Sequence, residues 1–460
     1  MPKIRTTRAW PLVRKATGRL SWGVADQAMS SLSNFAVNIF IARELGAVSY
    51  GAFSLAYVTY SFALNASRGL STDPLLVRFS GADDRNWRRA VASCTGTAAS
   101  AGLASGVGVL LVAALLHGTV RAAFIALGLT LPGLLLQDSW RFSFFAAGRG
   151  GQALLNDTIW TIALIPALGV LKVTHHASVF WFLLAWGLTA GVAGLIGPLQ
   201  ARVLPRPLTT LTWIYTHRDL GPRYLMEGTV NSSQTLLRNY SLAFILSIAA
   251  VGYIQAANTL MGPFMVVFFG MGLVTLPEAA RVLRRSPRHF PIFCALVSAG
   301  LGVAAVAWTV ILLVALPRGL GHAMLGSVWQ PSPRVHPTYP LVLPLGIFTI
   351  CACISAGAGT GLHALGASKR SLRAMSYSTV LYVVCCIAGA FVGGAVGAMY
   401  GAVVSGIVGT GLFWWELRQG FSDYRKGMAA NRTRRDLQTG RHRRQFGQPH
   451  AVPAGERESA

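Results

Sequence analysis

Twelve apolar segments alternate with short polar connections along this chain. Each segment is about 18–28 residues long, and a helix needs roughly 20 apolar residues to cross a hydrocarbon core about 30 Å thick. The pattern therefore predicts an all-α integral membrane protein. The expected membrane-spanning helices are 20–42, 51–77, 90–116, 122–147, 154–171, 177–199, 224–248, 250–276, 291–316, 338–365, 374–393 and 395–417.

Basic residues gather on alternate sides of these segments. With the N-terminus placed in the cytoplasm, 32 of the 40 Lys and Arg lie at cytoplasmic ends, five at external ends and three inside spans. The five external residues are Arg43, Arg121, Lys172, Arg318 and Arg334. Because Lys and Arg accumulate in cytoplasmic loops, this bias predicts a multi-pass protein of the cell membrane with both termini in the cytoplasm.

The longest internal connection divides the spans into two sets of six. An even number of spans in each half returns the chain to the same side, so the halves are expected to be parallel repeats around a central cavity, as in many transporters. Weak internal similarity, Ala47-Val48-Ser49-Tyr50 against Ala250-Val251-Gly252-Tyr253, favours a duplication. The predicted regions are a basic cytoplasmic segment 1–19, a six-helix bundle 20–199, a linker 200–223, a second bundle 224–417 and a basic, disordered cytoplasmic tail 418–460.

Composition agrees with a membrane protein, since 53% of residues are hydrophobic and only 12% are charged. The net charge of +25 is spread over short loops and tails, which favours anionic lipids over nucleic acid as the partner. The cysteines lie inside spans without metal-ligand spacing or polar neighbours, so we expect no metal site and no cofactor.

Arginines deep inside the spans suggest an anion site. Arg68 in the second span and Arg238 in the seventh lie too deep to reach the cytoplasmic surface easily. A guanidinium stays charged and binds phosphate oxygens in a bidentate way, so one anion between the halves could engage both. The alternative is that each arginine forms an internal salt bridge, although the seventh span has no acid at the depth of Arg238.

Other ionisable residues within the spans have a structural and a functional interpretation. Asp138 and Arg141 are three residues apart on one helix face and are expected to pair, with ligand binding by Arg141 as the alternative. Asp73 with Pro74 predicts a helix break or, alternatively, a substrate contact. Asp26 lies on a polar face that lines a wet cavity or interface, with proton or Na⁺ binding as the alternative.

Glu227 lies near the end of the seventh span and is expected to act as a cap or loop partner, with coupling or gating as the alternative. The sequence contains neither a nucleotide-binding GxxxxGK[ST] motif nor a metal-ligand pair on one helix face. We therefore expect no enzyme activity. A non-transporting membrane protein or an integral-membrane glycan enzyme is disfavoured by the charges buried in both halves and by the missing catalytic set.

The sequence also resembles a known family. Ala25-Asp26-Gln27-Ala28-Met29-Ser30-Ser31-Leu32-Ser33-Asn34-Phe35 is similar to the first helix of Wzx-like polysaccharide-export flippases, and Gln137-Asp138-Ser139-Trp140-Arg141 and Gly262-Pro263 add to the likeness. These flippases belong to the multidrug/oligosaccharidyl-lipid/polysaccharide (MOP) exporter superfamily. The resemblance covers residues 20–417, and its strength lies in the combination of motifs.

The resemblance implies two six-helix bundles that carry a polyprenyl-pyrophosphate-linked glycan between leaflets by alternating access. Arg68, Arg141 and Arg238 would contact the pyrophosphate, with Asp26 and Asp138 beside them, and glycosyltransferases or a polymerase of the same pathway would be partners. The main rival is a cation-coupled multidrug antiporter of the same superfamily. That rival predicts acids rather than arginines in the cavity.

Overall fold

The computed structural model describes residues 26, 29–329 and 338–445, which are helical and contain no strand. Eight helical segments of this part are long and apolar enough to cross a membrane. They lie on the helices α4 (Asp84–Leu115), α5 (Gly118–Ala146), α6 (Gly150–Val173), α7 (Val179–Ala201), α11 (Gly262–Arg285), α12 (Phe290–Ala315), α14 (Tyr339–Ala364) and α15 (Ser368–Gln445), the last only up to Lys426.

The remaining expected spans also fall on helices, but these helices are more polar. They are the N-terminal helix, described over residues 29–44, α2 (Ala47–Leu70) with α3 (Thr72–Phe79), α9 (Gly221–Ile245) and α10 (Ile248–Leu260). The last two expected spans both lie in α15, which bends at Gly393 and Gly394 where Gly394 has a φ of +60°. The predicted all-helical membrane fold is therefore confirmed.

Two expected spans are divided into two helices next to a proline. The second span divides at Ser71, so that Asp73 and Pro74 lie in the first turn of α3. The eighth divides between α10 and α11, with Pro263 in the first turn of α11. Proline suits a first turn because its missing N–H would have no partner there. The predicted helix break at Asp73-Pro74 is thus confirmed.

Helix α5 occupies the centre of the N-terminal half, where it contacts α2, α4, α6 and α7. Its large side chains, including Leu127, Leu131, Trp140 and Phe144, are fully buried. Polar residues on the same helix are consequently enclosed by protein rather than by lipid. In the C-terminal half α14 has the corresponding position, packed against α11, α12 and α15.

A seam formed by α2, α9 and α10 joins the two halves. Backbones approach closely at its glycines: a Cβ at Gly51 would lie 1.9 Å from the Ile248 carbonyl oxygen, and one at Gly252 would lie 2.1 Å from that of Ala47. Polar pairs, such as Thr59 with Tyr240 at 2.6 Å, cross the seam. Helix α9, the first helix of the predicted second bundle, packs along α2 through these small and polar residues and also contacts α15.

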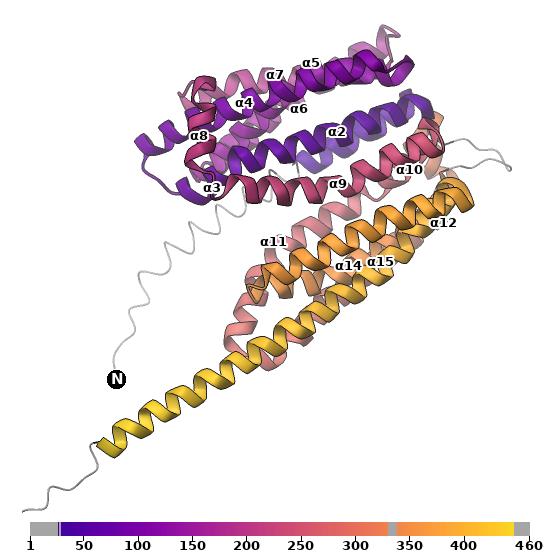
Figure 1. The fold of residues 1–460 in the computed structure, drawn as a ribbon. Coiled ribbons are helices and arrows are strands. Elements are labelled where there is room, and N and C mark those ends of the chain that lie inside the picture. Colours follow the sequence, from indigo (N-terminus) through magenta and orange to yellow (C-terminus); the bar gives the residue numbers. More distant parts are fainter. Residues whose placement is uncertain (1–25, 27–28, 330–337, 446–460) are drawn as a thin grey trace, which may run out of the picture.

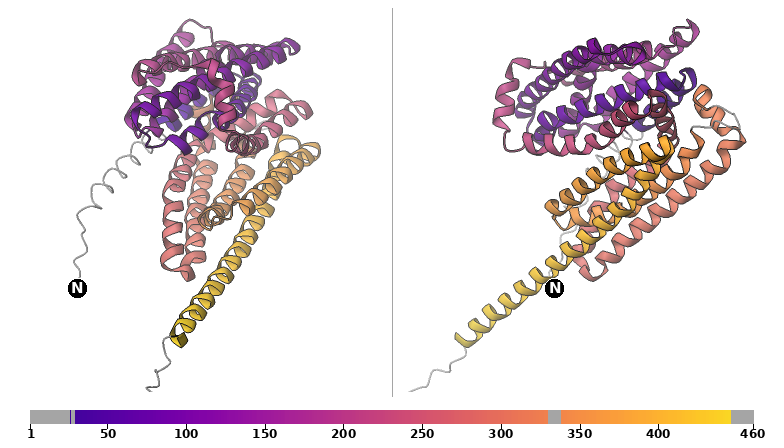
Figure 2. Two further views of the ribbon diagram at one scale, coloured as in Figure 1. Left: turned by 60° about the vertical axis from the view of Figure 1, so that its left-hand side comes forward. Right: turned by 45° about the vertical axis from the view of Figure 1, so that its right-hand side comes forward.

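The two groups of helices are inclined to each other (Figures 1 and 2). We call the end with α3, α8 (Thr210–Thr216) and the first turns of α4 and α15 the basic face, and the other end the opposite face. At the opposite face, residues 316–328 of the C-terminal half dock on the end of the N-terminal helix. There Arg43 donates to the Ala323 carbonyl at 2.8 Å, and Ser327 donates to that of Leu45 at 2.8 Å.

The linker and the tail both contain helices. The linker contains η2 (Pro207–Thr209) and α8, whose Trp213 indole donates to the Leu70 carbonyl at 3.1 Å. The tail was expected to be disordered from residue 418, but α15 continues to Gln445 and extends beyond the other helices (Figure 1). The Arg, Lys, Ala, Leu and Gln residues of the tail favour helix, and the first proline after residue 418 is Pro449. Segments 1–19 and 446–460 lie outside the described residues.

Candidate functional site: buried charges and three hollows

Arg68, at the last turn of α2, holds Asp138 of α5 in a bidentate ion pair. Its Nε donates to Oδ2 at 2.8 Å and its Nη2 to Oδ1 at 2.5 Å. The guanidinium also lies over the Phe142 ring, 4.7 Å from the centroid. The Arg68 side chain remains 26% exposed, whereas that of Asp138 is 8% exposed. The arginine therefore presents one edge to open space while its charge is balanced from behind.

Arg141 lies one turn beyond Asp138 but pairs with other acids. Its Nε donates to Asp26 Oδ2 at 2.6 Å and lies 3.4 Å from Asp157 Oδ2 on α6. The predicted pair between Asp138 and Arg141 is therefore wrong. Spacing of three along one helix supports only a weak interaction, whereas charge-assisted hydrogen bonds between helices satisfy groups that are buried from water.

Asp157 is a member of this network that the sequence analysis missed. Gln137 donates to its Oδ1 at 2.8 Å and to Asn156 Oδ1 at 3.2 Å. Asn156 in turn donates to the Ala193 carbonyl of α7 at 2.9 Å. An acid inside the expected span 154–171 is the same signal that identified Asp138. The charged network thus ties the N-terminal helix, α2, α5, α6 and α7 together.

The network contains one more carboxylate than guanidinium. Asp26, Asp138 and Asp157 face Arg68 and Arg141, and the Asp26 Oδ1 atom is buried without a hydrogen-bond partner in the described chain. A surplus acid in a buried cluster favours binding of a proton or a small cation. The prediction that Arg141 contacts a ligand anion is weakened, because two acids already neutralise it.

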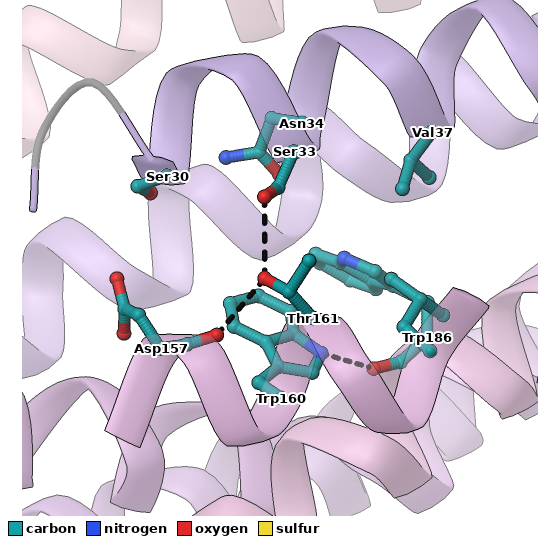
Figure 3. Close-up of a pocket in the computed structure, with 9 residues that line it drawn as sticks. Ser30, Ser33, Asn34, Val37, Asp157, Trp160, Thr161 and Trp186 are labelled. Carbon is teal, nitrogen blue, oxygen red and sulfur yellow. Dashed lines mark hydrogen bonds between the residues drawn. The ribbon is translucent and has the colours of Figure 1, made fainter. Parts of the chain in front are cut away.

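A small hollow with polar and aromatic walls adjoins Asp157 (Figure 3). Ser30, Ser33 and Asn34 line it from the N-terminal helix, and the Ser33 hydroxyl lies 3.2 Å from that of Thr161 on α6. Its volume is about 20 Å³, which is room for about one water. This part of the predicted polar face of the first span is therefore an interface with α6.

A larger cleft opens between the two halves at the basic face. It has a volume of about 510 Å³ and is lined from α2, α3, α5, α9 and α15. Arg68, Asp73 and Glu227 all line it, together with Phe142 and Met375. Glu227 was expected to be a cap or loop partner, but it forms no hydrogen bond or ion pair within the described residues and faces this cleft instead.

Arg238 on α9 is buried in a different environment. Only 5% of the residue is exposed, its Nη1 donates to the Tyr382 hydroxyl at 2.7 Å and its Nε to Asn239 Oδ1 at 2.9 Å. No carboxylate of the residues described forms an ion pair with it. Tyr382 lines a pocket of about 410 Å³ between α9, α11, α14 and α15, which is the third hollow.

The structure does not bring Arg68 and Arg238 together. Gly69 contacts the backbone of Leu225, whereas Arg238 lies 13 residues further along α9, or roughly 20 Å at 1.5 Å per residue. Arg68 lines the cleft at the basic face, whereas Arg238 is buried behind Tyr382, a lining residue of a different pocket. The expectation that both reach one anion does not fit this conformation, because the antiparallel course of α2 and α9 places their side chains at different depths.

The cysteines serve packing rather than chemistry. All six are free thiols, and all except the half-buried Cys385 are buried. No group of three His, Cys, Asp or Glu able to hold a metal occurs within the described ranges.

The chain shares its fold with transporters of the MOP superfamily. It superposes with a TM-score of 0.70 and 16% identity on an inward-facing multidrug resistance MATE transporter of this superfamily, over 86% of this chain and 95% of that one. The lipid II flippase MurJ, in an inward closed conformation, gives 0.67 and 12% identity over 87% and 89%. A MOP transporter from Pyrococcus furiosus gives 0.57 and 14% identity over 88% and 95%.

No family model matches the sequence, and no curated protein matches it. The structural likeness therefore confirms the predicted resemblance at the level of the superfamily fold.

Proposed function

We propose that this chain is a transporter that moves a polyprenyl-pyrophosphate-linked glycan across the cell membrane. The bias of basic residues assigns the basic face to the cytoplasm, with both termini on that side. The cleft at this face would then admit the substrate from the cytoplasmic leaflet. The likeness to a lipid II flippase supports a lipid-linked substrate at the level of the fold.

The observation that carries the anionic substrate is the isolated charge of Arg238. A charged side chain deep in a membrane costs about 2.5–3.5 kcal/mol on the insertion scale unless it is compensated. Arg68 and Arg141 each have a carboxylate partner, whereas Arg238 has only the neutral Tyr382 and Asn239. A pyrophosphate would supply the missing countercharge, because guanidinium groups bind phosphate oxygens with good geometry.

A fourth hollow, distinct from the three described above, supports the lipid part of the substrate. A groove of about 270 Å³ lies between the N-terminal helix and α10–α11, lined by polar residues such as Asn34 and by Phe35, Met265 and Phe269. Phe269 is 54% exposed. An apolar chain could remain against lipid here while its polar headgroup enters between the halves.

The acid surplus of the N-terminal half supports a coupling step in that half. We infer that Asp26 and Asp157 exchange a proton or small cation, while Asp73 and Glu227 act at the cytoplasmic entrance. Separate sites for a cation and an anion allow each half to respond to its own ligand. Anionic lipids at the basic face and glycosyltransferases or a polymerase of the same pathway are the proposed partners.

One observation favours a second candidate, a cation-coupled multidrug antiporter. The cleft at the basic face contains two acids, Asp73 and Glu227, against the single arginine Arg68, which is itself paired. A cationic compound would suit that cleft. The two candidates differ in the charge of the ligand that Arg238 attracts or repels.

Binding of farnesyl pyrophosphate to the purified protein in nanodiscs tests the proposal. Arg238→Gln should weaken binding about 10- to 100-fold, because a hydrogen bond to a charged group contributes about 1.5–3 kcal/mol. Arg238→Lys should retain part of the affinity, since it keeps the charge but loses the fork geometry. As a control, Arg85→Gln removes an exposed charge at the basic face, and this variant should bind farnesyl pyrophosphate like the wild type.

Unchanged affinity in Arg238→Gln would contradict the anion site. Tight binding of ethidium in place of farnesyl pyrophosphate, strengthened by Arg238→Gln, would favour the antiporter.

A further inference from the structure

The pocket beside Arg238 has two polar groups without partners. The side-chain amide of Gln234 forms no hydrogen bond within the described chain, and Ser378 Oγ is buried with none. A buried polar group that stays unpaired costs about 1–3 kcal/mol. Both groups line the pocket, so a polar ligand that fills it would remove this cost for the buried Ser378 hydroxyl and would give the half-buried Gln234 amide a partner.

Aromatic rings form the rest of the wall. The Phe348 and Tyr382 rings lie 5.2 Å apart at 40° to each other, and Phe413 lines the pocket as well. No charged residue is among the lining residues. Rings combined with amide and hydroxyl groups, without a charge, suit a ligand that has apolar faces and a rim of hydroxyl groups. A pyranose sugar has this construction.

Glycine keeps the pocket open. At Gly359 on α14 an added Cβ would meet only one side chain within 4 Å, that of Phe413 at 3.9 Å. The volume of about 410 Å³ falls in the range of pockets that hold small molecules, about 300–1,000 Å³. The pocket therefore has room for a ring, and its floor can be filled by a larger side chain without a backbone clash.

The pocket is placed next to the proposed phosphate site. Gln234 and Arg238 are four residues apart on α9 and share one helix face. Arg238 donates to Tyr382, which forms part of the pocket wall. A phosphate bound by Arg238 would thus lie directly beside the pocket. A sugar joined directly to that phosphate would then reach the pocket.

We propose that this pocket, between α9, α11, α14 and α15, binds the first pyranose ring of the lipid-linked substrate. The inference rests on the proposed function, because the ring is delivered by the pyrophosphate that Arg238 binds. The pocket recognises the ring as a class, through its faces and hydroxyl groups. The N-terminal half then takes no part in sugar recognition.

Two probes separate the sugar contribution from the phosphate contribution. Binding to the full-length protein in nanodiscs is measured for farnesyl pyrophosphate and for the same lipid carrying one N-acetylglucosamine. The wild type should bind the sugar-bearing lipid about tenfold more tightly, as expected from one or two net hydrogen bonds. Gly359→Leu should abolish this preference while leaving the affinity for farnesyl pyrophosphate unchanged.

A matched control is available in the same half. Gly300 on α12 has nothing within 4 Å of an added Cβ and lies on the exposed surface, so Gly300→Leu should keep the full sugar preference. Gln234→Ala provides a second variant that does not fill space. It should reduce the preference about threefold or more, by loss of one hydrogen bond of about 1 kcal/mol.

The outcomes are distinct. If the wild type shows no preference for the sugar, or if both Gly359→Leu and Gln234→Ala keep it in full, the sugar pocket is wrong and the phosphate site stands. If neither lipid binds the wild type, the proposed function is wrong and the sugar pocket is overturned with it.

Discussion

Arg141 balances two buried carboxylates that come from different helices. It contacts Asp26 and Asp157, and both side chains are almost completely buried. Removal of one partner from such a cluster is costly, because the remaining charges stay desolvated. Arg141 therefore has a structural role. For Arg68 and Arg238, an internal salt bridge of this kind was the alternative to an anion site.

The substitution Arg141→Gln should accordingly destabilise the protein by about 3–5 kcal/mol. The measurement is thermal unfolding of purified protein in nanodiscs, with Arg85→Gln as the exposed control. The double variant Arg141→Gln/Asp157→Asn should recover much of the loss, because it removes one of the uncompensated acids. Wild-type melting of the single variant would show that the three groups do not form an energetically coupled cluster.

Sequence could identify the members of this network better than their pairing. Charge within an apolar segment identified Asp26, Arg68, Asp138 and Arg141, and the same rule would have found Asp157. The pairing of Arg68 with Asp138 depends on how α2 and α5 are rotated against each other. A hydropathy pattern does not predict this rotation, because Arg68 and Asp138 are 70 residues apart in the sequence.

At the scale of single elements, the linker helix α8 ends at a buried histidine, its C-cap residue His217. His217 stacks on Trp213, with ring centroids 4.0 Å apart, and its Nδ1 lies 2.8 Å from the Trp213 carbonyl oxygen. Burial lowers the pKa of His217 below its usual value near 6.5. Nearby Arg78 and Asp219 form an exposed ion pair at 2.6 Å.

This lowered pKa makes docking of the linker depend on pH. The undocked linker binds a proton more readily than the docked one, so the stabilisation is complete above about pH 6.5 and is lost as the pH falls below that value. Hydrogen exchange of residues 207–220, corrected for intrinsic rates, should therefore increase between pH 7.5 and 5.5. His217→Phe keeps a stacked ring and should remove this dependence. An equal pH dependence in His217→Phe would exclude the histidine as its source.

The sequence indicates element boundaries where proline or glycine determines the local backbone conformation. Pro74 and Pro263 marked helix starts, and Gly393-Gly394 marked the bend that divides α15. The packing of α9 along α2 was not predicted, because it depends on contacts between distant glycines and the backbone. The helical tail was not predicted, because its high charge is typical of disorder although its residues up to Gln445 favour helix.

At the scale of the molecule, the fold followed from apolar periodicity and the partition of basic residues. These are strong signals, since the bilayer requires long apolar helices and disfavours charge. The sequence did not predict which end of the molecule is open. Residues 316–328 join the halves at the opposite face, and the 510 Å³ cleft lies at the basic face. Which end is open depends on small differences between alternative packings of the same helices.

The central claim is that the chain moves an anionic lipid-linked glycan between leaflets and that Arg238 holds its phosphate. The most direct test follows a fluorescent farnesyl pyrophosphate carrying one N-acetylglucosamine in proteoliposomes, through the fraction that an external quencher reaches with time. The account predicts transfer with the wild type and with Arg85→Gln, and at least tenfold slower transfer with Arg238→Gln at equal protein density. Transfer no faster than in protein-free liposomes, or equal rates for wild type and Arg238→Gln, would contradict it.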